Sequence, residues 1–516
     1  MTDSTATGSH VERDKQASAH PLPQWTLVLA VALLIGLALR AVILPLFVHD
    51  LLGYPVDYFF GEGDALVYTW RVIRGEAVYT NSSAYPMMGN IYPPVYLWIS
   101  AFFAKFAAPT LASARAFATI PLGLTMATVG LFLKRARVWP ALIAAGVLLI
   151  PCCYSMSHYL IVPRCDNWMA FFALASFYFL SSPELNRRDL ILGGAFAALA
   201  LFTKQTALPG LALIQLTLLI QQPRKGLIAL ASSAVCCAIL LAVALAQFGQ
   251  PMIEALTSLT SRRSLRLDQF WWGYLPALKS LCVIAAVAYG RAAWHVVSRW
   301  LPSAAPNSER KPWDLLDAYI VGHSIQTAFM LFMYSSSNYF LPVFPGMVIA
   351  TVLLTDAWLK REFRGPSQRI TRSVAVVCAL LVLQLYVQIP FENNVTRPDA
   401  DDVKQMQVAF DFMTGAQPVY AERCWGAIAE RADADAYFVE PTHIFVLPPG
   451  RLAPETLEAP FKEKKFARVM LFKGSAYHSE RLLNTIAENY TLAAKGYLKM
   501  CFGDVGYVEV LYFVRK

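Results

Sequence analysis

The chain has 516 residues, of which 56% are hydrophobic and 15% are charged. Soluble domains carry about 25% charged residues, so this composition excludes an ordinary soluble protein and indicates a polytopic membrane protein. The net charge of +9 comes from Lys and Arg in short clusters between apolar runs, which argues against a nucleic-acid-binding module and is typical of membrane topology signals.

The N-terminal residues 1–24 are polar and mix both charge signs, so we expect a disordered cytoplasmic tail. The apolar run that follows is longer than the core of a signal peptide, about 7 to 15 residues, and is predicted to be an uncleaved anchor. We predict about eleven membrane spans in total, at 25–47, 113–133, 138–157, 167–181, 190–203, 206–220, 226–247, 275–297, 314–334, 341–359 and 373–390.

Basic clusters between these segments are expected on the cytoplasmic side. They lie at 134–137, 187–188, 224–225, 310–311 and 360–372. All of them reach that side if the N-terminus is cytoplasmic and if 93–108 does not cross the membrane but forms an interfacial helix. The outer face then receives the first loop (48–112), the turn near Lys204, the loop 248–274 and the C-terminal tail.

The tail, residues 391–516, is predicted to form a small α/β domain outside the cytoplasm. Short strand-like runs at 419–421, 443–447, 469–472 and 507–514 alternate with helical stretches at 403–413 and 479–488. The tail also contains Cys424 and Cys501, and an oxidising compartment would permit a disulfide between them.

Asp64, in the first outer loop, is our candidate for a general base. It follows two glycines that allow close backbone approach, and its carboxylate is suited to take the proton of an attacking hydroxyl. Glu62 and Asp57 are alternatives for the same role. A structural interpretation is also open, in which Asp64 caps the helix that begins at Ala65.

Arg164, Asp166 and Lys204 form a second polar group on the predicted outer face. Asp166 is a further candidate catalytic carboxylate beside Arg164, or the two make an interfacial ion pair. Lys204 lies with Gln205 between two short apolar runs, so its ammonium needs an anionic partner inside the protein. That partner is either a substrate phosphate or a protein carboxylate.

Three arginines in the loop 248–274, beside Trp271 and Trp272, go against the positive-inside trend. They bind either lipid headgroups or a substrate phosphate at the rim of a site. These residues are Arg262, Arg263 and Arg266.

Six short motifs occur in order along the chain: Gly-Asp-Ala at 63–65, Arg-Gly-Glu-Ala-Val-Tyr at 74–79, Tyr-Pro-Pro-Val-Tyr at 92–96, Arg-Cys-Asp at 164–166, Thr-Lys-Gln-Thr-Ala at 203–207 and Asn-Tyr-Phe-Leu-Pro at 338–342. Together they resemble the GT-C glycosyltransferases that use lipid-linked sugars, among them the protein mannosyltransferases and the lipid A aminoarabinose transferases. The resemblance extends over most of residues 25–390.

This resemblance implies a GT-C fold with two interfacial helices in the first outer loop, near 65–74 and 93–108. It assigns the catalytic loop carboxylate to Asp64 and places Lys204 and the loop arginines near the donor phosphate. The motif residues that we expect to bind substrate are Tyr79, Tyr92, Arg164, Gln205, Asn338 and Tyr339. The chain departs from the family in having Asp64-Ala65 where many members have Asp-Glu, and in having Tyr92 where aminoarabinose transferases carry a lysine.

The resulting expectation is a transmembrane catalytic domain at 25–390 that moves a sugar from a polyprenyl phosphate to a glycolipid, polysaccharide or protein. The active site would face the periplasm of a bacterial inner membrane. No cofactor is expected, and a divalent metal held by Glu62, Asp64 and Asp166 is the less favoured possibility. The alternatives are a lipid-linked glycan transporter and a non-catalytic envelope assembly protein.

Overall fold

The computed structural model describes residues 24–54, 62–79, 90–153, 156, 159, 162–258, 267–268, 270–298, 314–331, 337–362, 367–388, 400–421, 436–437, 454–473, 480–502 and 505–516. Several sequence-based predictions lie outside these residues and are therefore not addressed by the structure. They concern the N-terminal tail before Gln24, Asp57, the loop arginines Arg262, Arg263 and Arg266, the strand-like run 443–447, and the pairing of Cys424 with Cys501.

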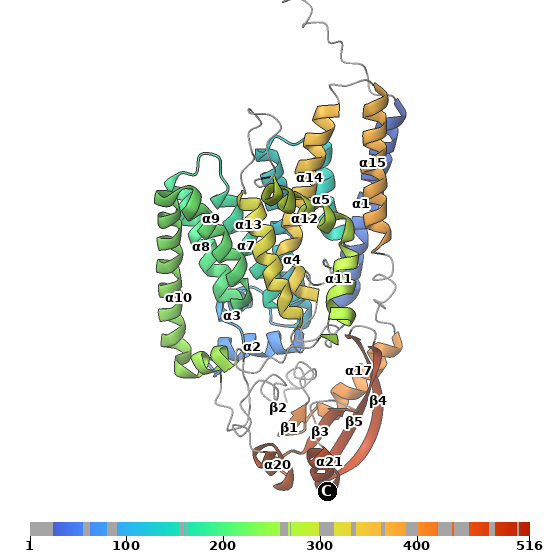
Figure 1. Ribbon diagram of the computed structural model, residues 1–516. Coiled ribbons are helices and arrows are strands. Elements are labelled where there is room, and N and C mark those ends of the chain that lie inside the picture. Colours follow the sequence, from blue (N-terminus) through green and yellow to red (C-terminus); the bar gives the residue numbers. More distant parts are fainter. Residues whose placement is uncertain are drawn as a thin grey trace, which may run out of the picture.

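The larger part of the chain is a bundle of helices that run roughly side by side (Figure 1). Its long helices are α1 (Gln24–Leu52), α4 (Leu111–Arg135), α5 (Pro140–Cys152), α7 (Cys165–Leu180), α8 (Arg187–Thr203), α9 (Leu208–Gln221), α10 (Pro223–Ser258), α12 (Cys282–Val297), α13 (Leu315–Thr327), α14 (Val343–Glu362) and α15 (Ser367–Tyr386). Ten of the eleven predicted spans each overlap one of these helices, and the remaining span, 275–297, overlaps α12 and a short helix before it.

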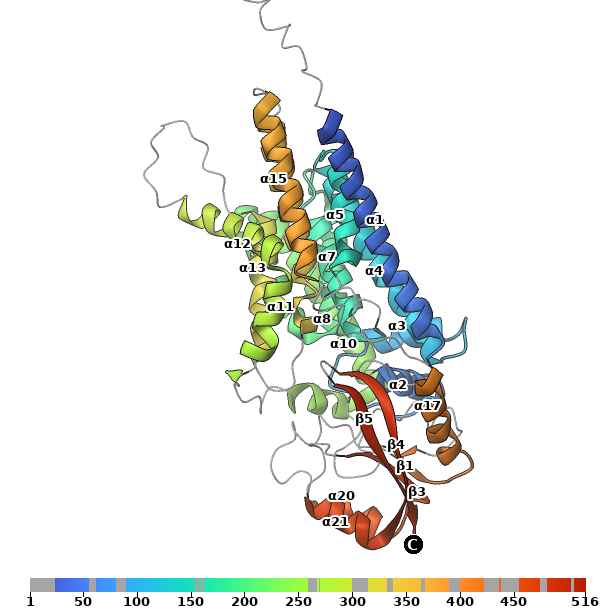
Figure 2. The ribbon, with the colours of Figure 1, turned by 90° about the vertical axis from the view of Figure 1, so that its right-hand side faces the viewer.

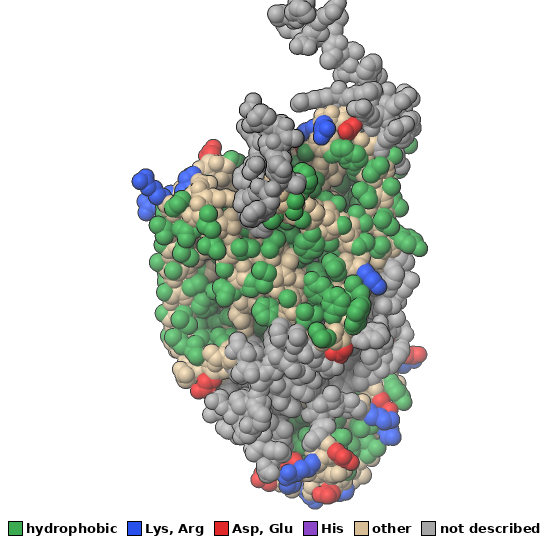
Figure 3. Space-filling view, in the orientation of Figure 1, with side chains coloured by type: hydrophobic (Ala, Val, Ile, Leu, Met, Phe, Trp, Pro, Cys, Tyr) green, Lys and Arg blue, Asp and Glu red, His purple; other side chains and the backbone are tan. Residues whose placement is uncertain are grey.

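A band of hydrophobic side chains covers the bundle, and charged side chains gather above and below it (Figure 3). In the described residues, α1, α4, α10 and α14 contain stretches long and apolar enough to cross a membrane. Shorter apolar helices, including α5 and α12, lie beside them. The chain is therefore a helical multi-pass membrane protein, while the total of about eleven crossings stays a prediction.

Two of the basic clusters expected in the cytoplasm meet at one end of the bundle. The Lys360 ammonium at the end of α14 donates to the Arg137 carbonyl in the α4–α5 turn, at 2.8 Å. The same lysine pairs with Asp356, whose carboxylate also accepts from the Trp139 backbone N–H. Figure 1 places this end of α14 opposite the end that carries α2. This agrees with the topology derived from charge.

The predicted span 275–297 is two helices, because α11 (Leu275–Ser280) ends before α12 begins at Cys282. Gln384 of α15 satisfies the backbone groups at this break. Its side chain donates to the Ser280 carbonyl at 2.7 Å and accepts from the N–H groups of Val283 and Ile284. An apolar environment requires such internal partners for any interrupted helix. The sequence pattern within one helix could not reveal a partner about a hundred residues away.

At the end that carries α2, three elements do not run with the bundle. The helices α2 (Glu62–Arg74) and α3 (Val95–Phe103) belong to the first outer loop, as the resemblance implied, although α3 is shorter than the predicted 93–108. The long helix α10 bends at Gly249, where φ is 65° and ψ is −157°. Its residue Gln247 accepts a hydrogen bond from Trp98 of α3 at 2.7 Å, so the bend is fastened to the first loop.

The C-terminal part contains a five-stranded sheet in the order β2-β1-β3-β5-β4, beyond α2 in both views (Figures 1 and 2). The strands β1, β2 and β3 are parallel, and β5 runs antiparallel to β3 and β4. The elements are α17 (Ala400–Met413), β1 (Val419–Ala421), β2 (Ala436–Tyr437), α20 (Pro454–Lys462), β3 (Arg468–Phe472), α21 (Glu480–Asn489), β4 (Tyr490–Phe502) and β5 (Val505–Arg515). Three elements were not predicted: β2, α20 and β4.

Helices α9 and α13 approach closely through two glycines. A Cβ atom on Gly322 would lie 2.8 Å from the Gly210 Cα atom, and one on Gly210 would lie 2.3 Å from the His323 ring. We predict that Gly322→Ala lowers the free energy of unfolding by about 1–3 kcal/mol, because the backbone of α9 cannot yield to the added methyl group. Gly36→Ala is the control, since no atom lies within 4 Å of its added Cβ. Thermal unfolding in detergent measures both, and equal melting temperatures would contradict this packing.

Candidate active site

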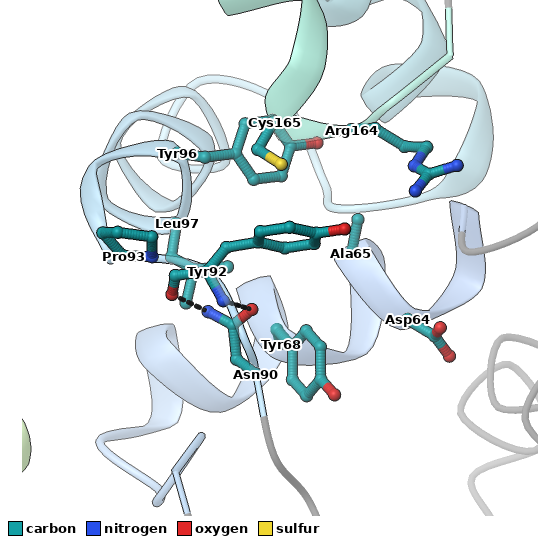
Figure 4. A pocket seen from close by; sticks show the side chains of 10 residues that line it. All are labelled: Asp64, Ala65, Tyr68, Asn90, Tyr92, Pro93, Tyr96, Leu97, Arg164 and Cys165. Carbon is teal, nitrogen blue, oxygen red and sulfur yellow. Dashed lines mark hydrogen bonds between the residues drawn. The ribbon is translucent and has the colours of Figure 1, made fainter. Parts of the chain in front are cut away.

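A pocket opens at the α2 end of the bundle, where three segments distant in the sequence meet (Figure 4). They are the first turns of α2, the segment that leads into α3, and the start of α7. The enclosed space is about 40 Å³, so it holds only a few small groups and a larger ligand must extend through the open mouth. The lining residues are Asp64, Ala65, Tyr68, Asn90, Tyr92, Pro93, Tyr96, Leu97, Arg164 and Cys165.

Asp64 lies in the first turn of α2 and is only 4% exposed. Because the helix begins at Glu62, Asp64 is its third residue and does not occupy the capping position that the structural interpretation required. A carboxylate in the first turn interacts favourably with the helix dipole. In Figure 4, its side chain lies beside Ala65, at the edge of the group of lining residues.

Glu62, predicted as an alternative base, is absent from the pocket lining and is bound to Arg115 of α4. The guanidinium donates to both carboxylate oxygens, at 3.0 and 2.7 Å, and both side chains are almost completely buried. Arg115 also donates to the backbone carbonyls of Leu51 and Tyr54. This group joins the end of α1 to α2 and α4, and so fixes the helix on which Asp64 lies. The sequence reading missed Arg115, whose only signal was a basic residue at the outer end of a predicted span.

Tyr79 and Asn90 hold the backbone of Tyr92 at the pocket wall. The Tyr79 hydroxyl donates to the Tyr92 carbonyl at 2.6 Å, and the Asn90 amide donates to that carbonyl and to the Tyr79 hydroxyl, at 2.9 and 3.1 Å. Burial raises the pKa of the Tyr92 phenol to about 12, although the nearby Lys204 ammonium opposes the shift. The ring that faces the pocket is therefore a neutral phenol at physiological pH. Asn90 was not predicted.

Asp166 and Lys204 form a buried ion pair beneath this wall. The Lys204 ammonium lies 2.5 Å from Asp166 Oδ1, and each side chain is about 1% exposed. Asn338 donates to the same oxygen at 2.8 Å, and the Arg164 Nε lies 3.7 Å from the other oxygen. The sequence left open whether Lys204 pairs with a substrate phosphate or with a protein carboxylate. In the structure it pairs with the carboxylate of Asp166.

Aromatic rings enclose the Lys204 ammonium. It lies 4.4 Å from the centroid of the Tyr339 ring and 5.3 Å from that of Tyr92, within the range of cation–π attraction. The next residue, Gln205, donates to the Ile91 carbonyl at 3.0 Å and so supports the segment before Tyr92. The motifs at 92–96, 164–166, 203–207 and 338–342 therefore meet in space. Lys204 and Asp64 lie at the same end of the bundle, but Lys204 does not line the pocket.

A second, larger cavity of about 400 Å³ runs between α2, α3 and α4. It shares Ala65 and Tyr96 with the first pocket. The remaining lining is free of charged side chains and consists of Leu66, Thr69, Ser100, Phe103, Ala104, Phe106, Ala107, Pro109, Ser113, Ala114, Ala116, Phe117 and Ile120. An apolar groove thus adjoins the polar pocket through Ala65 and Tyr96.

The three carboxylates considered as metal ligands do not converge in the described part of the chain. Glu62 is bound to Arg115 and Asp166 to Lys204, which leaves Asp64 on a different wall. The described His and acidic residues that lie within ligand distance of one another are His295, Asp314 and Asp317 of α12 and α13. Arg291 already pairs with both of these aspartates. That group contains none of the predicted site residues.

No family model matches the sequence, and no curated protein matches it. Among solved structures, the chain is similar to ArnT from Cupriavidus metallidurans in the apo state. The two share 14% sequence identity with a TM-score of 0.58, over 93% of this chain and 97% of that chain. ArnT bound to undecaprenyl phosphate matches with 14% identity and a TM-score of 0.54, over 94% and 97% of the two chains. This likeness confirms the GT-C fold.

We predict that Glu62→Gln mainly reduces stability, because it leaves the buried Arg115 guanidinium without a charged partner. Removal of one member of a buried ion pair costs about 3–5 kcal/mol. The double variant Glu62→Gln/Arg115→Met is expected to recover part of this loss. Thermal unfolding of the single and double variants measures the coupling. A Glu62→Gln protein with native stability but no activity would instead support a catalytic role for Glu62.

Proposed function

We propose that the chain is a membrane glycosyltransferase that moves a sugar from a polyprenyl phosphate to an acceptor on the extracytoplasmic side. The observation that carries this proposal is the pocket itself, in which a buried carboxylate, Asp64, and a guanidinium, Arg164, open into one space beside an apolar groove. A lipid-linked sugar has matching parts: a reacting carbon, an anionic leaving group and a hydrocarbon chain.

In the proposed reaction, Asp64 accepts the proton of the acceptor hydroxyl as its oxygen attacks the anomeric carbon of the donor. The bond between that carbon and the phosphate oxygen breaks, and its electron pair stays on the departing polyprenyl phosphate. Arg164, which is positioned at the pocket, stabilises this developing negative charge. A single displacement of this kind inverts the configuration of the sugar.

The pocket residues divide into reacting and supporting groups. We assign Asp64 and Arg164 to the chemistry, and the phenol of Tyr92 to contact with the donor. Tyr79, Gln205 and Asn338 support the wall through the hydrogen bonds described above. Arg262, Arg263 and Arg266 remain proposed contacts of the donor phosphate at the rim. Compared with the sequence interpretation, Arg164 replaces Lys204 as the principal cation.

We also propose that the reaction needs no metal ion. Two of the three carboxylates that would supply ligands already bind cationic side chains, Glu62 to Arg115 and Asp166 to Lys204. The cellular setting that suits this chemistry is a bacterial inner membrane with the site at its periplasmic face. Addition of a chelator to a working transfer assay tests the first point, and a loss of activity that Mg²⁺ or Mn²⁺ restores would refute it.

We predict that Asp64→Asn lowers the rate of sugar transfer by about 10²–10⁴-fold, the usual contribution of a general base. Binding of undecaprenyl phosphate should stay close to native, because the amide keeps the shape of the side chain. The assay uses purified protein in nanodiscs and follows release of polyprenyl phosphate from a labelled donor. Asp189→Asn, a change in the first turn of α8, is the matched control. A fully active Asp64→Asn protein would remove the assignment, and donor binding without release in the native protein would favour a transporter.

The apolar groove generates a second prediction. Ala114→Trp, on its α4 wall, should fill the groove and reduce transfer to or from a lipid substrate by about tenfold or more, because hydrocarbon is excluded from the cavity beside the pocket. Ala127→Trp, an exposed position further along α4, should leave transfer unchanged. Equal rates for the two variants, measured in the same nanodisc assay, would show that no substrate chain occupies the groove.

A further inference from the structure

Lys204 lies where the chain breaks between two helices of the bundle. The α8 helix ends at Thr203, and Lys204 adopts extended backbone angles, φ −154° and ψ 117°, before the short 3-10 helix η2 (Gln205–Ala207) leads into α9. Its ammonium is 1% exposed. An ammonium buried to this degree is stable only beside an anion, and Asp166 provides one.

Four segments of the chain meet around this ammonium. Asp166 begins α7, Tyr92 leads into α3, and Tyr339 belongs to the short 3-10 helix η5 (Ser337–Phe340). One carboxylate oxygen of Asp166 accepts from both Lys204 and Asn338. The other faces Arg164 Nε at 3.7 Å. Removal of the lysine would therefore change the surroundings of two residues that line the pocket, Tyr92 and Arg164.

The charges argue against Lys204 as a ligand of the donor phosphate. Both cations face Asp166, Lys204 at 2.5 Å and Arg164 Nε at 3.7 Å. Of the two, Arg164 is the one that reaches the pocket, because its side chain is 19% exposed and lines the pocket. A phosphate that reached Lys204 would have to separate it from Asp166 and leave that carboxylate buried without its strongest partner.

We infer that Lys204 is a positioning residue: through its ion pair with Asp166 and its contact with the Tyr92 and Tyr339 rings, it fixes the wall that presents Arg164 and Tyr92 to the donor. This inference rests on the proposed function for the identity of the donor, but the geometry of the Lys204–Asp166 pair does not depend on it. Lys204 makes no contact with the donor phosphate in this account.

The test compares Lys204→Met, Asp166→Asn and the double variant Lys204→Met/Asp166→Asn, with undecaprenyl phosphate as the binding probe. A single change leaves one buried charge without its closest charged partner, so each should weaken binding by about tenfold or more. The double variant removes both charges together and keeps the volumes of the two side chains close to native. Its affinity should return to within about threefold of native. Arg164→Gln should lose about tenfold or more in affinity while it keeps native thermal stability.

A separate readout needs no ligand. Cys165 lies between Arg164 and Asp166 and is 3% exposed, so its alkylation by N-ethylmaleimide, quantified on its peptide by mass spectrometry, reports the state of the wall. We expect faster alkylation in Lys204→Met and native-like alkylation in the double variant. Unchanged alkylation in Lys204→Met would overturn the positioning role. A native protein that bound no polyprenyl phosphate would count against the proposed function instead, and the alkylation result would still decide the role of Lys204.

The result that overturns the inference in the binding assay is a double variant with native stability and native Cys165 alkylation that still binds undecaprenyl phosphate as weakly as Lys204→Met. Lys204 would then be a ligand. Should the variants not fold, a cryo-EM map of the native protein with undecaprenyl phosphate decides the question. Phosphate beside Arg164, with Lys204 still paired with Asp166, supports the positioning role of Lys204. Phosphate bound to the Lys204 ammonium contradicts it.

Discussion

The buried ion pair between Lys204 and Asp166 is the interaction on which the arrangement of the candidate site depends. In water such a pair contributes little, but both of these side chains are almost fully buried, where each charge is costly without the other. Since Asp166 lies in α7 and Lys204, 38 positions later, lies at the α8–α9 break, the pair sets how these two segments meet. Asn338 and Tyr339 bring η5 to the same point, and Tyr92 brings the segment before α3.

A second buried ion pair does the same for Asp64, the proposed base. Arg115 binds Glu62 and two carbonyls near the end of α1, and Asp64 follows Glu62 by two residues on the same helix. The site is thus placed by two separate charge pairs, one beneath each wall of the pocket. Such an arrangement suits the proposed chemistry at a membrane boundary, because a mobile outer loop would admit water and lose the alignment of base and leaving group.

Much of this organisation was accessible from the sequence, because long apolar runs and basic clusters are strong signals for helices and topology. The motif residues at 92, 164–166, 204–205 and 338–339 were also predicted to belong together, and they do meet. The roles within the group were harder to assign. Whether a lysine in an outer turn faces a phosphate or a carboxylate depends on a partner distant in the chain, and no local pattern encodes it. For the same reason Arg115, Asn90 and Gln384 escaped notice, since each acts through a long-range contact. The strand β4 was missed because Ala494 and Gly496 have weak strand propensity, and in the described sheet they pair with β5, a partner that no local pattern indicates.

The proposed function requires that a sugar reacts in the space between Asp64 and Arg164. The most direct measurement is photocrosslinking of the native protein with a polyprenyl phosphate donor that carries a diazirine on its sugar, followed by peptide mapping. Adducts are expected on the segments 64–68, 90–97 and 164–165, which contain the residues that line the pocket. Adducts confined to the opposite end of the bundle, or to the C-terminal sheet alone, would contradict it.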